Sequence, residues 1–167
     1  MKESLLYICR KMIRAEKSHI RTHILQCIGV FAALLFLLNV GKLMNAKLLI
    51  APFGATCTIL FGFPDSPFSK AKNIMGSYFI CSLVGIGVFN LWGNSSHWVA
   101  IAVSLAVLLM FLTKLIHPPA GAVTIIAIDS GAKWLFILVP VSLGAFIIVV
   151  SGFLYHKLHR KIESKQV

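Results

Sequence analysis

Long apolar runs, each about the length of a membrane crossing, dominate the pattern along this chain. A helix that crosses the hydrocarbon core needs about 20 mostly apolar residues, because the core is about 30 Å thick and each residue rises about 1.5 Å. Four runs meet that length, at residues 24–44, 73–92, 98–116 and 134–155. Trp92 ends the second run and Trp98 begins the third, as aromatic rings favour the headgroup level. The pattern predicts four long transmembrane helices.

Two further apolar stretches, residues 48–63 and 118–128, are too short for an ordinary crossing. The first contains Ala-Pro-Phe-Gly-Ala and the second Pro-Pro-Ala-Gly-Ala. Aligned on Pro52 and Pro119, both give Pro-x-Gly-Ala followed by threonine and β-branched residues. Proline suits the first position of a helix, where its missing N–H would have been unpaired anyway. Each stretch therefore predicts a short helix that begins at proline.

The shared motif has the same place in each half of the chain and suggests an internal repeat. Residues 22–93 and 97–156 would each contain a long, a short and a second long helix, within a transmembrane domain of residues 22–156. Basic segments at residues 1–21 and 157–167 flank this domain. Two three-helix units are inverted relative to each other when each crosses an odd number of times, a common plan in transporters. Chance similarity between two apolar motifs is the alternative.

The distribution of Lys and Arg chooses between two topologies, since cytoplasmic flanks are rich in both. Six crossings place three further cations beside the basic ends: Lys70, Lys72 and Lys114. They leave three cations outside: Lys42, Lys47 and Lys133. Four crossings with two re-entrant helices give a smaller excess inside and stay the alternative. The charges favour six crossings in the inner (plasma) membrane, with both termini in the cytoplasm.

Composition supports a membrane location and excludes several functions. The chain is 58% hydrophobic and 13% charged, with a mean hydropathy of +0.88, whereas soluble chains are about half apolar and a quarter charged. The net charge of +11 would suggest nucleic-acid binding in a soluble chain, but here the cations flank apolar runs. The sequence has no P-loop, serine-hydrolase elbow, His-Glu-x-x-His or Cys/His cluster. We expect an all-α polytopic protein in the lipid bilayer that is not an enzyme, has no cofactor or metal and binds no nucleic acid.

The starts of the two short helices form the candidate substrate site. A helix N-terminus carries unpaired N–H groups and about half a positive charge, which favours anions. Gly54 and Gly121 would let a ligand approach the backbone, although close helix packing through small residues is the alternative. The candidate residues are Pro52, Phe53, Gly54, Ala55 and Thr56 in the first motif and Pro118, Pro119, Ala120, Gly121 and Thr124 in the second.

His117 directly precedes the second proline pair, and an ionisable group at membrane depth indicates function. Imidazole changes charge near neutral pH, so a protonated His117 would attract an anion and transport would increase as pH falls. Capping of the short helix is the alternative. Lys114, on the same helical face, would add positive potential or extend to the surface. In the connector of residues 63–69, Asp65 or Ser66 is placed to cap a short helix that begins at Pro67.

Three ordered motifs, at residues 51–55, 61–67 and 115–122, closely resemble those of the HPP family of integral membrane proteins, named for the His-Pro-Pro triplet. The resemblance covers about residues 20–156 and implies about four transmembrane helices. Some plastid and cyanobacterial members are implicated in nitrite transport. The resemblance also identifies the core motif positions as His117, Pro118, Pro119, Gly121, Pro52, Phe53 and Gly54.

Together, these features predict a transporter or channel for a small inorganic anion, with nitrite favoured by the resemblance. A membrane scaffold or sensor subunit that transports nothing is the alternative. Six helical segments, two of them short, enclose a cavity poorly, so we expect a homo-oligomer, with a dimer as the simplest case. Small residues offer close helix contacts for it: Gly76, Gly85, Gly87 and Gly144.

Overall fold

The computed structural model describes the backbone of residues 2–163 and the side chains of residues 20–161. Within that part of the chain, helices are the regular structure, which confirms the all-α prediction. The elements are α1 (Lys2–Leu43), α2 (Pro52–Gly62), η1 (Pro67–Ser69), α3 (Ala71–Trp92), α4 (Ser96–Thr113), η2 (Pro118–Ala120), α5 (Gly121–Asp129), η3 (Ile137–Ser142) and α6 (Leu143–Glu163).

Four helical stretches are long and apolar enough to cross a membrane, as predicted. They are Ile20–Leu43, Ala71–Trp92, Ser96–Thr113 and Ile137–Lys161. Helix α1 begins at Lys2, far before its apolar part, because Lys, Arg and Glu continue a helix well. Helix α4 ends at Thr113 and not at residue 116, since Lys114 adopts a left-handed conformation with φ 57°. The fourth stretch is interrupted at Val139, directly before Pro140, where a helical backbone is disfavoured.

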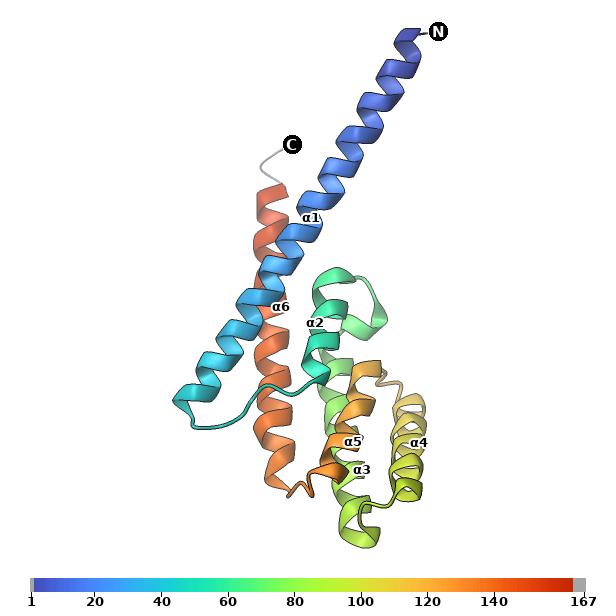
Figure 1. Ribbon diagram of the computed structural model, residues 1–167, viewed down its shortest axis with the longest axis vertical. Coiled ribbons are helices and arrows are strands. Elements are labelled where there is room, and N and C mark those ends of the chain that lie inside the picture. Colours follow the sequence, from blue (N-terminus) through green and yellow to red (C-terminus); the bar gives the residue numbers. More distant parts are fainter. Residues whose placement is uncertain (1, 164–167) are drawn as a thin grey trace.

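The successive helices alternate in direction along the long axis of the molecule (Figure 1). In the view of Figure 1, helices α1, α3 and α5 run downward, whereas α2, α4 and α6 run upward. The start of α1 and the end of α6 therefore lie toward the same end of the molecule. Helices α2 and α5 begin near the same height and run in opposite directions. The inverted repeat stays a prediction, although this arrangement agrees with it.

Glycines hold the helices of the bundle close together. A Cβ atom on Gly85 of α3 would lie 2.8 Å from the Thr124 carbonyl oxygen of α5, and one on Gly76 would meet the Leu115 side chain. The space beside Gly144 of α6 is likewise filled by the ring of Phe53 from α2. The prediction that Gly76, Gly85 and Gly144 face another copy is therefore wrong, because these glycines pack against helices of their own chain.

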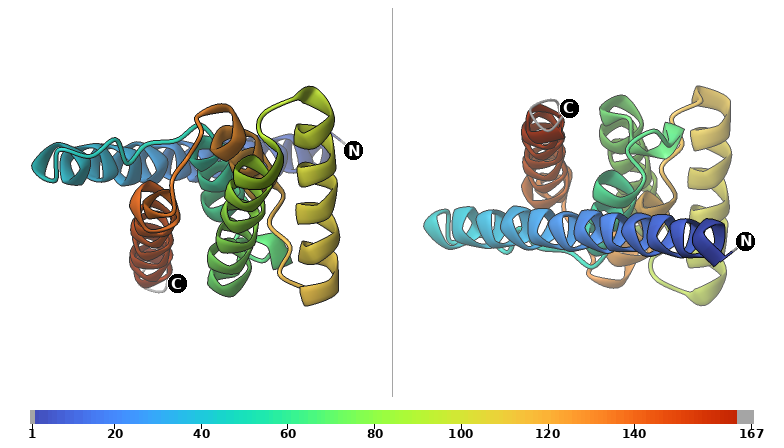
Figure 2. Two further views of the ribbon diagram at one scale, coloured as in Figure 1. Left: turned by 90° about the horizontal axis from the view of Figure 1, so that it is seen from below. Right: turned by 90° about the horizontal axis from the view of Figure 1, so that it is seen from above.

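Helix α1 crosses the direction of α3, α4 and α6 (Figure 2).

Candidate functional site

His117 is fully enclosed where α2, η1 and α3 meet the segment between α4 and η2. Its Nε2 atom lies 2.8 Å from Thr56 Oγ1, and its Nδ1 atom lies 2.8 Å from the Phe68 carbonyl oxygen. Thr56 Oγ1 in turn lies 2.7 Å from the hydroxyl oxygen of Tyr78. Both Thr56 and Tyr78 are also fully buried. We call this chain of hydrogen bonds, from Tyr78 through Thr56 and His117 to the Phe68 carbonyl, the His117 network.

The partners of the imidazole determine where its protons lie. A carbonyl oxygen only accepts, so Nδ1 of His117 donates to Phe68. In the neutral ring Nε2 then accepts, which means that Thr56 donates to His117 and Tyr78 donates to Thr56. This pattern satisfies every donor in the His117 network. The neutral ring is favoured, because a buried cation is costly without a paired anion and none of these partners is a carboxylate.

A protonated ring would find one alternative arrangement. Its Nε2 would donate to Thr56, whose hydroxyl would then turn to the Pro52 carbonyl oxygen, 3.1 Å away. The hydroxyl of Thr56 can therefore pair in either state, and the cost of protonation is that of the buried charge alone. In this structure His117 has no exposed surface with which to touch an ion.

The local sequence explains why His117 points inward. A residue before proline favours an extended backbone, and His117 has φ −141° and ψ 98°. The turn at Lys114 and this extended residue separate α4 from η2. His117 occupies the N-cap position of η2 but its side chain makes no capping hydrogen bond, so the capping alternative is wrong. The expected shared face with Lys114 is also wrong, because α4 ends before Lys114, which is exposed whereas His117 is buried.

The starts of the short helices are more self-contained than the sequence predicts. Pro52 is the first residue of α2, as expected. The N–H groups of Phe53 and Gly54, however, donate to carbonyl oxygens three residues earlier, at 3.0 and 3.2 Å. Those of Ala120 and Gly121 likewise donate to carbonyls of the preceding turn. The expectation that these N–H groups are free for an anion is therefore wrong, and the attraction for an anion must come from the helix dipoles.

The model of the transmembrane region of HPP proteins matches residues 15–164 of this chain. The chain belongs to the HPP family. This finding confirms the resemblance that the three motifs indicate.

The HPP chain is also similar to two transmembrane proteins of Dictyostelium discoideum. One is 33% identical over 137 residues, which are 76% of this chain and 48% of the relative. The other is 31% identical over 142 residues, which are 80% of this chain and 46% of the relative. The chain thus spans about half the length of these curated relatives. No solved structure matches it.

The HPP motif residues divide into a buried and a surface group. The buried group comprises Pro52, Phe53, Thr56, His117, Ala120 and Thr124. Gly54, Ala55 and Pro118 are exposed, and Pro119 and Gly121 are half-buried. Thr124 donates to the Cys81 carbonyl oxygen at 3.0 Å and so joins α5 to α3. A Cβ atom on Gly54 or Gly121 would meet nothing within 4 Å, so neither glycine packs against a helix of its own chain.

Two members of the His117 network in this HPP protein, Tyr78 and the Phe68 carbonyl, were not identified from the sequence. Tyr78 is the one that a signal could have found, because it stands within an apolar run and a buried tyrosine hydroxyl usually has a partner. The Phe68 carbonyl carries no such signal, since any residue has one. The connector does hold its predicted cap, as the Ser66 hydroxyl oxygen accepts from the N–H of Phe68 at 3.2 Å.

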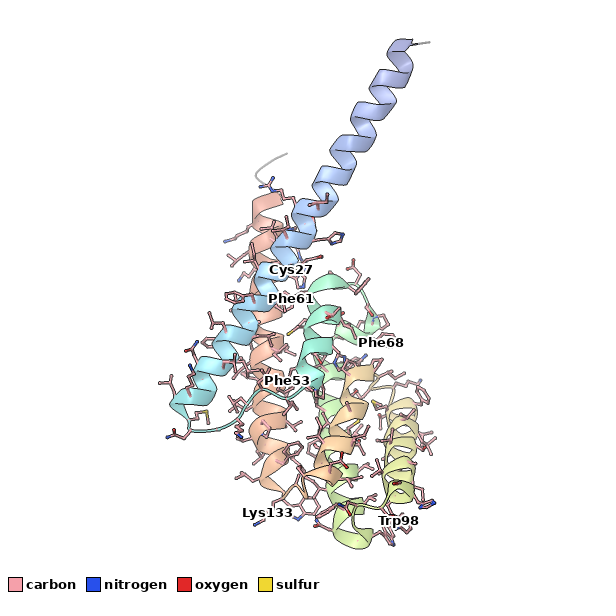
Figure 3. All side chains as sticks on the ribbon, in the orientation of Figure 1. Cys27, Phe53, Phe61, Phe68, Trp98 and Lys133 are labelled. Carbon is pink, nitrogen blue, oxygen red and sulfur yellow. The ribbon has the colours of Figure 1, made fainter. Side chains whose placement is uncertain are left out.

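A cavity of about 340 Å³ lies between α1 and α2. It is lined by His23, Gln26, Cys27, Val30, Cys57, Thr58, Phe61 and Gly62. Cys27 and Phe61, on opposite helices of this cavity, are labelled in Figure 3. Its polar side is formed by His23 and Gln26, whose side chains lie 3.0 Å apart, and by Thr58. Among the side chains of residues 20–161, no group of three His, Cys, Asp or Glu could hold a metal ion.

Proposed function

We propose that this HPP protein forms a membrane transport path for a small inorganic anion, with nitrite as its first candidate substrate. The proposal is carried by the meeting of the two proline-led segments. Helix α2 contacts η2, and the Thr56–His117 hydrogen bond joins them. Helices α2 and α5 run in opposite directions from this region (Figure 1), so both present the positive ends of their dipoles there. Discontinuous helices of transporters present their dipoles to anions in this way.

The exposed backbone at Gly54 and the half-buried backbone at Gly121 are where an anion would approach. Their N–H groups already donate within the chain, so the interaction would be weaker than direct hydrogen bonding. Weak binding suits transport, because an ion that binds tightly leaves slowly. His117 would act as a positioning residue in this site, since it joins the two helix starts and is itself enclosed.

The cavity between α1 and α2 would give access to this region. It reaches α2 at Cys57 and Thr58, which follow Thr56 directly. Polar groups at membrane depth are tolerated where they line a wet cavity, and His23, Gln26 and Thr58 would provide such a lining. We propose that the protein lies in the inner (plasma) membrane with both termini in the cytoplasm. Because His23 and Gln26 lie near the start of the apolar part of α1, this cavity would then open toward the cytoplasm.

The proposed assembly is a homo-oligomer, with a dimer as the simplest form. One face of α2 carries small residues at helical spacing that remain exposed in the single chain: Ala51, Gly54, Ala55 and Thr58. Small residues allow transmembrane helices of two subunits to approach closely, and in such a dimer the proposed anion path at Gly54 and Thr58 would lie between the two subunits. The mass of the purified protein in mild detergent would measure the number of subunits. A monomer in both detergent and native lipid would contradict this part of the proposal.

Uptake of nitrite into proteoliposomes tests the function. Liposomes without protein are required at each pH, because nitrous acid crosses bilayers unaided. We expect saturable nitrite uptake that Gly121→Val abolishes by covering the backbone. Gly87→Val is the matched control, since a Cβ atom at Gly87 of α3 also meets nothing within 4 Å. Folded protein that carries neither nitrite nor any other small inorganic anion would overturn the proposal.

A second function, that of a membrane scaffold or sensor subunit, is favoured by one observation. The His117 network is fully enclosed and pairs all of its donors, as expected of a structural fastener. A scaffold would co-purify with a dedicated partner protein and would show no flux. A transporter would show flux in liposomes that contain this chain alone, so the same preparation separates the two functions.

A further inference from the structure

A groove on α6 combines one aromatic ring with three cations. It has a volume of about 450 Å³ and is lined by Phe153, Lys157, Arg160 and Lys161. These residues share one face of α6, because Lys157, Arg160 and Lys161 follow Phe153 by four, seven and eight residues, which are spacings of about one and two helical turns. All four side chains are exposed. The groove is separate from the His117 network and from the cavity between α1 and α2.

The three described charged side chains that line the groove are all cations. Asp65 and Asp129 are the acidic residues within the part of the chain whose side chains are described, and neither lines the groove. Arg160 and Lys161 also lie in the last turn of α6, where cations stabilise the negative end of a helix dipole. That role does not involve Phe153, which is 66% exposed one helical turn before Lys157. The groove therefore offers an apolar floor next to a cationic end.

The position along α6 places these two parts at different membrane depths. The apolar stretch Ile137–Lys161 has 25 residues. Because the backbone breaks at Val139, only α6 (Leu143–Glu163, 21 residues) is a continuous helix, and its length of about 31 Å is close to a hydrocarbon core of about 30 Å. The last turns of α6 thus reach the headgroups, whereas Phe153, about 6 Å before Lys157, stays beside the acyl chains.

We propose that this groove binds an anionic phospholipid. The phosphate would accept hydrogen bonds from Lys157 and from the Arg160 guanidinium, which can contact two phosphate oxygens at once. One acyl chain would lie against Phe153. Phosphatidylcholine offers the same phosphate but carries its own cation, so an anionic headgroup binds more tightly to a cationic surface. The site is independent of the proposed transport function.

Native mass spectrometry of the full chain in mild detergent tests this site. The protein is titrated with phosphatidylglycerol and, separately, with phosphatidylcholine of the same acyl chains. We expect preferential retention of phosphatidylglycerol. The Lys157→Gln/Arg160→Gln double variant should bind it about 25-fold more weakly, since each cation near a membrane surface contributes about fivefold in affinity. Phe153→Ala should weaken binding of both lipids.

A control is Lys133→Gln, which removes one positive charge at the opposite end of the molecule (Figure 3) and should leave lipid binding by the groove unchanged. Arg160→Lys keeps the charge and should retain most of the affinity, which separates loss of the site from loss of folding. Equal phosphatidylglycerol binding by the double variant would overturn the proposal. Displacement of the lipid by inorganic phosphate at millimolar concentration would also overturn it, because it would indicate a site for free phosphate.

Discussion

The imidazole Nε2 atom of His117 lies 2.8 Å from the hydroxyl oxygen of Thr56, although the two residues are 61 positions apart in the chain. This single contact joins the two proline-led segments, because Thr56 lies in the first turns of α2 and His117 directly precedes η2. Tyr78 and the Phe68 carbonyl extend the contact to α3 and η1. The meeting point of α2 and η2, where the anion site is proposed, is therefore also held together by buried hydrogen bonds.

Thr56→Val should strongly destabilise the fold. The substitution keeps the shape of the side chain but leaves His117 and Tyr78 without their shared partner. A buried polar group without a partner costs about 1–3 kcal/mol. Thr58→Val is the control, because the exposed Thr58 hydroxyl only donates to the Gly54 carbonyl of its own helix, at 3.1 Å. Thermal unfolding in one detergent compares the two, and equal melting temperatures would contradict the importance of the His117 network.

Tyr78→Phe should cost less than Thr56→Val. It removes the hydroxyl that donates to Thr56, while Thr56 keeps His117 as its acceptor. A typical hydrogen bond contributes about 1 kcal/mol. The Thr56→Val/Tyr78→Phe double variant should lose less stability than the sum of the two single variants, because the second change removes a group that the first left unpaired. Strict additivity in the unfolding measurements would show that the two hydroxyls act independently.

The long helices could be predicted from the sequence because they depend on hydrophobic length alone. A run of about 20 apolar residues has few alternatives in a membrane. The exact ends could not be predicted where one residue reverses the chain. Lys114 ends α4 through its left-handed backbone, and a lysine side chain does not predict that conformation. The break at Val139 did have a signal, namely the following Pro140.

The candidate site was only partly predictable, for a different reason. The motifs identified His117, Thr56 and the proline-led helix starts, but not which of them touch. Contacts between residues far apart in sequence depend on how the helices pack. The free N–H groups expected at the helix starts are paired because Ala51, which precedes Pro52, already has a helical backbone. Three glycines expected between subunits pack within the chain for the same reason, since sequence alone does not say which helix a small residue faces.

His117→Gln should lower nitrite flux by a similar factor at every pH between about 5.5 and 8, around the ordinary imidazole pKa of about 6.5. The enclosed site favours the neutral ring, and in the proposed function His117 positions the two helix starts, so its loss should disturb the site independently of charge. A role as a charged anion ligand gives a different result. Wild-type flux would then rise as pH falls, and the variant would lose this rise. Protein-free liposomes at each pH correct for nitrous acid leakage.

Cysteine labelling in intact cells should show the two loops that join α2 to η1 and α3 to α4 on opposite faces of the membrane. The helices alternate in direction (Figure 1), so a complete crossing by the segment that contains α2 would separate these loops. Ser95 and Asp65 are suitable sites, because both are exposed. Cys9 and the exposed Cys27 are first replaced by serine, so that they do not contribute a background signal. Ser95→Cys should react with an impermeant maleimide from outside, whereas Asp65→Cys should react only after the membrane is opened, since Lys70 and Lys72 place its loop in the cytoplasm. Labelling of both from the same side would reject six crossings and favour four crossings with re-entrant short helices.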